Sequence, residues 1–195
     1  MTGSATPQSV RDKLIIAGLK ELNAHGVQNF SVRRTASECG VSCAAPYKHF
    51  ADKQDFIAAI IRFGNSQWKE RQRKIVDMYP SPRRKQILEI SLEHIRFLVE
   101  NPYFRSLIML KDAPLDTQYA RSRGKLSRLA MRLIRRYCAE VGMDEKTAKV
   151  KTYIVRSLIY GAALMFDNGE MEYNEENMEA VAQAIDREFD LPSFE

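Results

Sequence analysis

The stretch SVRRTASECGVSCAAPYKHF, residues 31–50, has the pattern of a helix, a turn and a second helix. Ser31 is a typical N-cap for the first helix, and because the third helical position holds an arginine, no capping box is expected there. Gly40 stops this helix, and Ser42 is the expected N-cap of the next one. A turn of about three or four residues between two helices is the spacing of a helix-turn-helix.

The second helix of this pair is expected to be short and to begin with Cys43, Ala44 and Ala45. Pro46 falls at the end of its first turn, where the missing N–H costs little. In a helix-turn-helix, the start of the second helix meets base edges in the major groove. The small side chains of Ala44 and Ala45 allow that approach and can contact thymine methyl groups. Phe50, an aromatic residue without a polar tip, is instead expected in the core of this small domain.

Polar side chains near the end of this helix are suited to contacts with DNA bases and phosphates. Lys48 can reach guanine acceptors or a phosphate, and Tyr47 and His49 are suited to phosphate oxygens. A place in the core remains the alternative for Tyr47. Asp52 is the expected N-cap of a further helix whose first turn includes Lys53, so a second phosphate site is expected at that N-terminus.

Residues 10 to about 61 resemble the DNA-binding domain of the TetR (tetracycline-repressor) family of bacterial one-component regulators. The resemblance rests on LIIAGLKELNAHG, SVRRTASECGVS, PYKHF and DKQDF, in this order and spacing. It implies an all-α protein of about nine helices. A helix-turn-helix DNA-binding domain is expected at 9–62, followed at 63–195 by a larger helical domain for effector binding and dimerisation.

The resemblance also implies a set of DNA contacts, in which the base-reading positions are Cys43, Ala44, Ala45 and Lys48. The expected contact residues are Ser31, Arg33, Ser42, Cys43, Ala44, Ala45, Tyr47, Lys48, His49 and Lys53. Two positions depart from the family: Thr35 stands where an apolar residue is usual, and Pro46 stands where leucine is usual. We expect both to affect stability and sequence preference more than DNA binding itself.

The chain has 195 residues, of which 45% are apolar and 28% charged, which is typical of a folded protein with a hydrophobic core. No apolar run reaches the length of a membrane span, and the start has no signal-peptide pattern, so a cytoplasmic protein is expected.

The chain has an odd number of cysteines, Cys39, Cys43 and Cys138, which are expected to be reduced thiols without a metal site. The sequence contains no phosphate-binding loop or hydrolase motif, so neither catalysis nor a cofactor is expected.

Helical periodicity continues along the rest of the chain, interrupted by prolines and glycines. The first helix is expected at 10–25, and the later ones at 53–78, 82–100, 103–111, 117–141, 145–168 and 174–189. In the family this later part varies with the ligand. Aromatic and methionine side chains are the candidates for an effector pocket, with ordinary core positions as the alternative. These candidates are Phe97, Phe104, Met109, Met131, Tyr153 and Tyr160.

The helix at 145–168 is apolar around most of its circumference, so more than one of its sides must be buried. The resemblance implies that the last two long helices pack against their symmetry mates as a four-helix bundle. The residues expected to face the partner are Val155, Ile159, Ala162 and Phe166, with Val181 and Ile185 of the last helix. A second apolar side runs through Val150, Leu158 and Met165, and the sequence does not determine which side faces the partner.

The net charge of +5 allows an acidic partner such as DNA. The arginines between 121 and 136 are expected to form a solvated helix face. The helix at 145–168 has one narrow polar stripe, which contains Lys149, Thr152, Arg156 and Asp167. Arg156 is expected to face solvent, with an anion-binding role as the alternative.

Two functions fit these features. The first is a homodimeric repressor that binds a palindromic double-stranded operator and releases it when a small apolar or aromatic effector enters the C-terminal domain. The second is a helical protein-interaction module with generic DNA affinity and no effector. Sequence-selective, salt-dependent DNA binding would favour the first.

Overall fold

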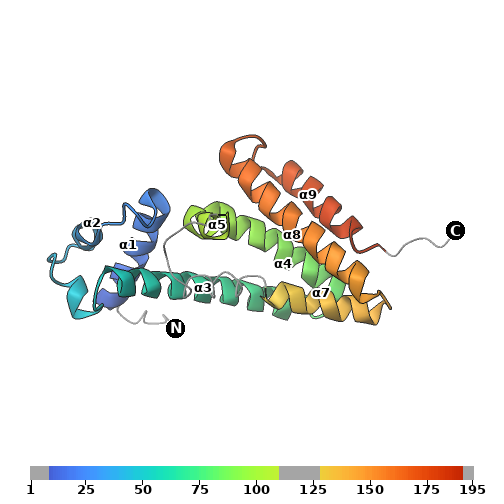
Figure 1. The fold of residues 1–195 in the computed structure, drawn as a ribbon, viewed down its shortest axis with the longest axis horizontal. Helices are drawn as coiled ribbons and strands as arrows, with labels where there is room; N and C mark the ends of the chain where they lie inside the picture. Colours follow the sequence, from blue (N-terminus) through green and yellow to red (C-terminus); the bar gives the residue numbers. More distant parts are fainter. Residues whose placement is uncertain (1–8, 110–127, 191–195) are drawn as a thin grey trace, which may run out of the picture. The chain divides into compact units, whose positions relative to one another are not determined.

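Helices form all the regular secondary structure in the residues that the computed structural model describes, 9–109 and 128–190, with only the backbone described at 106–109. The all-α class predicted from the sequence is confirmed. Figure 1 shows the order α1 (Val10–His25), α2 (Val32–Glu38), the 3-10 helix η1 (Pro46–Lys48), α3 (Lys53–Met78), α4 (Arg83–Glu100), α5 (Pro102–Met109), α7 (Arg128–Glu140), α8 (Glu145–Asn168) and α9 (Glu175–Arg187). The chain divides into two compact units between Gln67 and Trp68, inside α3.

Helix boundaries follow the local capping residues. Ser31 Oγ accepts the backbone N–H of Arg34 at 3.2 Å and so caps α2 as predicted. α1, α3 and α8 have the bounds expected from the sequence. α4 and α9 begin one residue later than predicted, because Pro82 and Asn174 occupy their N-cap positions. The helix expected at 117–141 is described only as α7, since its first residues lie outside the described ranges.

The core of the N-terminal unit joins α1, α2 and the start of α3. At Gly18, a Cβ atom would lie 2.6 Å from Cδ1 of Ile60, so the absence of a side chain permits the close approach of α1 to α3. Phe50 stacks on Phe56 with ring centroids 4.2 Å apart, and Phe50 is 3% exposed. The expectation that Phe50 belongs to the core is confirmed, and its burial anchors the end of the helix-turn-helix.

α4 is the central helix of the C-terminal unit and packs against α5, α7, α8 and α9. Its buried side chains include Ile87, Ile90 and Ile95. Arg84 ties α4 to α9, with its Nε 2.7 Å from Oδ1 of Asp186. None of the helices within the described ranges is long and apolar enough to span a bilayer.

The stripe of α8 predicted to face a partner subunit is buried within its own subunit. Its members are between 1% and 7% exposed and belong to the core beside α4; they are Val155, Ile159, Ala162 and Phe166. In α9, Ile185 is fully buried and Val181 is half-buried. This burial argues against the stripe as the surface that faces a partner, and the interface itself stays a prediction. Periodicity located two apolar sides of the helix but could not tell which one the subunit covers.

The opposite side of α8 is the one that leaves apolar side chains in solvent. We call it the outer face of α8, and it contains Val150, Tyr153, Leu164 and Met165, which are 51%, 73%, 37% and 40% exposed. Gly161 lies on the same face, and a Cβ atom built there would meet nothing within 4 Å. Within the described residues this face has no covering element.

Candidate DNA-binding surface and effector site

A buried carboxylate braces α1 against the start of α2. Glu21 of α1 accepts the backbone N–H of Ser31 at 3.0 Å and the Nε–H of Arg34 at 2.9 Å. Burial raises the pKa of Glu21, but the bonds from Arg34 and Ser31 and the nearby positive charges outweigh it, so the pKa lies below its usual value. Arg34 also donates to the carbonyl of Asn29 at 2.6 Å. The arginine that replaces a capping-box acid therefore fixes the N-terminus of α2 in space.

The turn after α2 is held by backbone bonds of the Schellman type. The N–H of Gly40 donates to the carbonyl of Ser37 at 3.0 Å, and that of Val41 donates to Ala36 at 3.1 Å. Gly40 has φ +67°, a conformation that favours glycine. Thr35 is fully buried, and its hydroxyl donates to the carbonyl of Ser31 at 2.9 Å, so this departure from the family leaves no unpaired polar group.

Residues 43–50, the reading segment, do not form the α-helix that the sequence predicted. Only Pro46–Lys48 is helical, as a 3-10 turn. The carbonyl of Ser42 accepts the N–H of Ala45 at 2.9 Å, and the carbonyl of Ala45 accepts the N–H of Lys48 at 3.1 Å. An α-helix would need an N–H at position 46 to reach the Ser42 carbonyl, and proline has none. Pro46 therefore selects the tighter turn.

Most of the predicted DNA-contact residues, in the reading segment and around it, are nevertheless exposed to solvent. Tyr47 is 57% exposed, which argues against its alternative role in the core. Arg33 and Lys48 are exposed and make no ion pair within the described residues, so their charges are available to phosphates. The other exposed members of the predicted set are Ser42, Cys43, Ala44 and His49, while Ser31, Ala45 and Lys53 are half-buried.

The N-terminus of α3 is already occupied by acidic groups. Asp52 Oδ1 accepts the N–H of Asp55 at 2.8 Å, as the sequence predicted, and Asp55 accepts the N–H of Ala51 at 3.2 Å. These carboxylates compete with a phosphate for the free N–H groups. Lys53, whose Nζ lies 6.0 Å from the ring centre of Phe30, is the positive group that remains at this end.

The residues predicted to line an effector pocket separate into two places. Phe97 and Phe104 are buried, with ring centroids 5.4 Å apart, in an aromatic cluster that also includes Trp68, His94 and Tyr160. Met131 and Tyr153 instead line a groove between α7 and α8. The side chain of Met109 lies outside the described residues. The five positions with described side chains therefore do not form a single pocket.

His94 is a buried polar residue at the centre of the aromatic cluster. Its ring stacks on Trp68 with centroids 4.8 Å apart, and its Nε2 has no hydrogen-bond partner in the part of the chain that the structure describes. Burial, with a smaller contribution from the charge of Arg156, lowers the pKa of His94 to about 4. The imidazole is therefore neutral at physiological pH. The sequence offered no sign of this, since the partners of His94 come from other helices.

The N-terminal unit thus has the architecture of a helix-turn-helix DNA-binding domain. Residues 14–60 match the family model described as "Bacterial regulatory proteins, tetR family". A stretch of 83 residues, 42% of this chain, is 29% identical to an HTH-type transcriptional regulator of Staphylococcus aureus (strain bovine RF122 / ET3-1). That match spans 44% of the relative's own length. Residues 14–60 therefore form a DNA-binding domain of the TetR family of bacterial regulators.

Solved structures share the fold over nearly the whole chain. A protein from Rhodococcus sp. described as a candidate TetR-family transcriptional regulator has a TM-score of 0.68 and 18% identity, with 93% of this chain and 98% of that chain covered. The regulator FadR from Bacillus subtilis, in complex with stearoyl-CoA, has a TM-score of 0.69 and 12% identity, with 91% and 96% covered. At these identities the likeness establishes the fold alone.

Proposed function

We propose that this TetR-family regulator is a homodimeric repressor, which binds a palindromic operator and releases it when a small molecule enters the C-terminal unit. The observation that carries the proposal is the reading segment, whose exposed Tyr47, Lys48 and His49 follow a firmly held turn. Base edges in the major groove are reached by such a segment, while phosphates bind the surrounding polar and basic groups.

The outer face of α8 supports the homodimer. Apolar residues gathered on one face of a monomer mark a site of association. A second copy can cover this face with the same face of its own α8, as two-fold symmetry requires, and the bare backbone at Gly161 favours close helix approach. A two-fold dimer matches an operator whose half-sites are roughly 34–36 Å apart, or a multiple of that distance.

The C-terminal unit supports binding of an effector with an apolar or aromatic part. Its aromatic cluster surrounds Nε2 of His94, which has no hydrogen-bond partner among the described residues and which a bound molecule or water can satisfy. The FadR structure of the same fold contains stearoyl-CoA, a molecule with a long apolar chain. These observations favour the repressor over the interaction module, for which the described residues show no dedicated surface apart from the outer face of α8.

The experiment is to capture genomic fragments on the purified protein, sequence those retained, and titrate the best fragment and a scrambled copy. The proposal predicts a palindromic site, bound at least about 10³-fold more tightly than the scrambled duplex. Equal affinity for both duplexes would favour the interaction module. A thermal-shift screen of metabolites should then yield a stabilising compound that lowers operator affinity, and stabilising compounds that never change operator affinity would contradict induction.

A further inference from the structure

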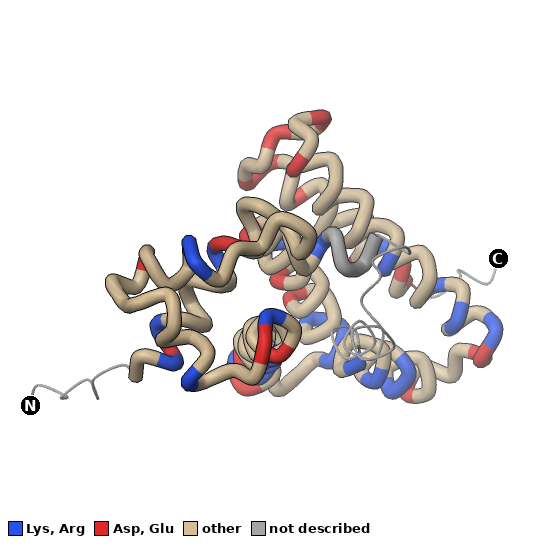
Figure 2. Tube along the Cα trace, turned by 60° about the vertical axis from the view of Figure 1, so that its left-hand side comes forward, with Lys and Arg blue, Asp and Glu red and all other residues tan. Residues whose placement is uncertain are grey.

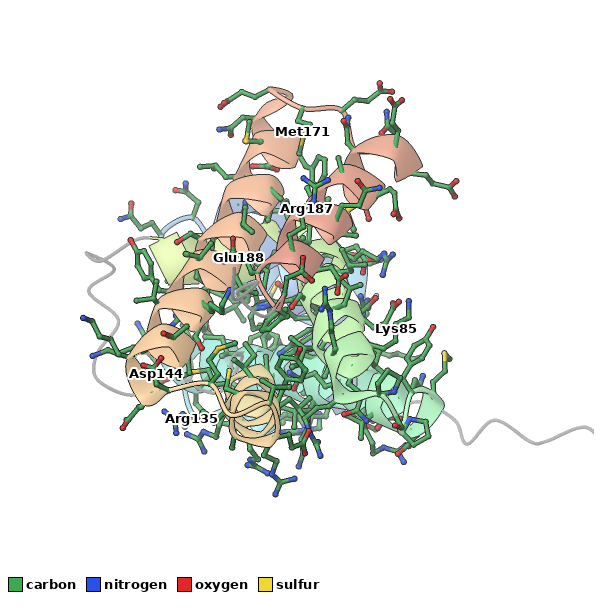
Figure 3. The ribbon with its side chains drawn as sticks, turned by 90° about the vertical axis from the view of Figure 1, so that its right-hand side faces the viewer. Lys85, Arg135, Asp144, Met171, Arg187 and Glu188 are labelled. Carbon is green, nitrogen blue, oxygen red and sulfur yellow. The ribbon has the colours of Figure 1, made fainter. Side chains whose placement is uncertain are left out.

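The groove between α7 and α8 combines a basic rim with a soft apolar floor. It has a volume of about 750 Å³, and its floor includes Met131 and Met143. Arg135 of α7 and Lys149 and Arg156 of α8 supply the rim. Figure 3 views the unit from this end, with Arg135 on α7 labelled near the start of α8. The groove is therefore shaped for a molecule that has both an apolar body and a charged end.

The rim cations lack carboxylate partners within the described residues, unlike several arginines elsewhere in the C-terminal unit. Arg135, Lys149 and Arg156 make no ion pair within the described ranges. By contrast, Arg84 pairs with Asp186 at 2.7 Å, and Arg105 pairs with Asp167. A basic group held at a groove without an internal acid retains its charge for a ligand.

The surrounding charge strengthens this positive potential. Glu145 is the one acidic residue among those that line the groove. Arg128 and Arg132, exposed on α7, add further positive charge nearby. Figure 2 shows the basic residues along α7 and the first turns of α8, while acidic residues gather at the turn between α8 and α9. The basic end of α8 is thus the one that attracts an anion.

We propose that this groove binds a small organic anion, whose phosphate or carboxylate head pairs with Arg135, Lys149 and Arg156 and whose apolar body lies on the methionine floor. Guanidinium groups bind both kinds of head through paired N–H···O bonds. Methionine side chains adapt to apolar bodies of different shapes. The inference rests on the proposed effector function and adds the chemical class of the ligand.

Arg156 also connects the groove to the aromatic cluster. Its guanidinium lies 5.7 Å from the ring centre of Tyr160, and that ring lies 6.0 Å from the ring of His94. His94 stacks on Trp68, the only tryptophan of the chain. An anion that pairs with Arg156 changes the field along this chain of contacts. Its binding should therefore be visible in tryptophan fluorescence.

The test uses the full chain and calorimetric titration with decyl phosphate, decanoate, decanol and inorganic phosphate. We expect decyl phosphate and decanoate to bind at least about tenfold more tightly than decanol, which shares the body but not the charge, and to change the Trp68 fluorescence. Inorganic phosphate, which lacks the body, should bind more weakly than decyl phosphate. The phosphate and carboxylate probes show which head is preferred. Decanol binding as tightly as the two anions would overturn the proposal.

Variants locate the site. Arg135→Glu and Lys149→Glu should each weaken decyl phosphate binding about tenfold or more, whereas the matched control Lys69→Glu, an exposed lysine of α3, should bind as the wild type does. Equal binding by all three variants would overturn the proposal. Displacement of decyl phosphate by a scrambled DNA duplex in the wild type, but not in Arg135→Glu, would also overturn it, since the groove would then be a DNA surface.

Operator titration with decyl phosphate separates this inference from the function on which it rests. Groove-dependent binding of the probe supports the anion site even if operator affinity stays unchanged, and the unchanged affinity would count only against induction by this ligand. Conversely, release of the operator by another compound, without any groove-dependent binding of the anions, would overturn the anion site and leave the repressor intact.

Discussion

Lys48 lies exposed in the reading segment, where its ammonium group has no acidic partner within the described residues. If it reads a base, Lys48→Ala should change the preferred operator base and cost about 1–3 kcal/mol on the best site. Selection from randomised operators, followed by titration of the winners, measures both effects. Unchanged affinity together with unchanged preference would exclude Lys48 as a base-reading residue.

Tyr47 and His49 provide the comparison at the same scale, because both are expected to hold phosphates, which carry no sequence information. Tyr47→Phe and His49→Ala should therefore weaken binding to all sequences alike and leave the preferred operator unchanged. A change of base preference in either variant would show that the residue contacts a base rather than a phosphate.

His94 gives the C-terminal unit a defined pH dependence. Its pKa falls from 6.5 in the unfolded chain to about 4 in the folded one, because burial, aided by the charge of Arg156, disfavours the imidazolium. Between these values the unfolded chain binds a proton that the folded chain does not, so stability is lost as pH falls from about 6.5 towards 4. The loss attributable to His94 is up to about 3 kcal/mol.

Urea unfolding at several pH values tests this prediction. His94→Phe keeps an aromatic ring beside Trp68 but removes the titrating group, so its stability should fall less than that of the wild type over this range. The same slope for wild type and His94→Phe would show that His94 is not the source.

At the scale of the elements, local signals predicted the helix ends because a cap depends on neighbours in the sequence. Ser31, Gly40 and Asp52 behave as their residue types predict. The Glu21–Arg34 brace was not predicted, since it joins residues 13 apart on different helices. The reading segment was expected to be an α-helix. It forms a 3-10 turn instead, because Pro46 has no N–H to donate to the carbonyl of Ser42.

α8 shows the same limit of local sequence patterns. Its periodicity correctly indicated apolar residues on two sides of the helix. Which of the two sides packs into the subunit depends on contacts with α4, which no local pattern reveals. Ile159→Glu, on the side now known to be buried, should unfold the C-terminal unit rather than release a monomer, because a carboxylate would enter the core. The sequence likewise did not predict that Arg135, Lys149 and Arg156, which lie on two different helices, line the same groove.

The outer face of α8 makes a specific prediction about association. Met165→Glu places a charge on this face, which is 40% exposed at that position, and should give a folded monomer in sedimentation. Met78→Glu changes a methionine that is 68% exposed on α3 and should leave the dimer intact. A dimeric Met165→Glu protein would mean that a different surface joins the subunits, and a monomeric wild type would contradict the dimer itself.

At the scale of the whole molecule, the proposed function gives complementary roles to the exposed reading segment in one unit and to the outer face of α8 in the other. A single reading segment offers few base contacts, and each mismatched base pair costs only about 1–3 kcal/mol. Joining two copies doubles the contacts and imposes a spacing on the half-sites. Under the proposed function, we therefore expect operator recognition to depend on both units together.

Fluorescence anisotropy with three duplexes tests this dependence most directly: the retained operator, the operator with one half-site scrambled, and a full scramble, each at two salt concentrations. A two-fold dimer should bind the intact operator about 10²-fold or more tightly than the half-scrambled duplex, and the full scramble more weakly still, with all affinities falling as salt rises. Equal affinity for all three duplexes at both salt concentrations would contradict the account.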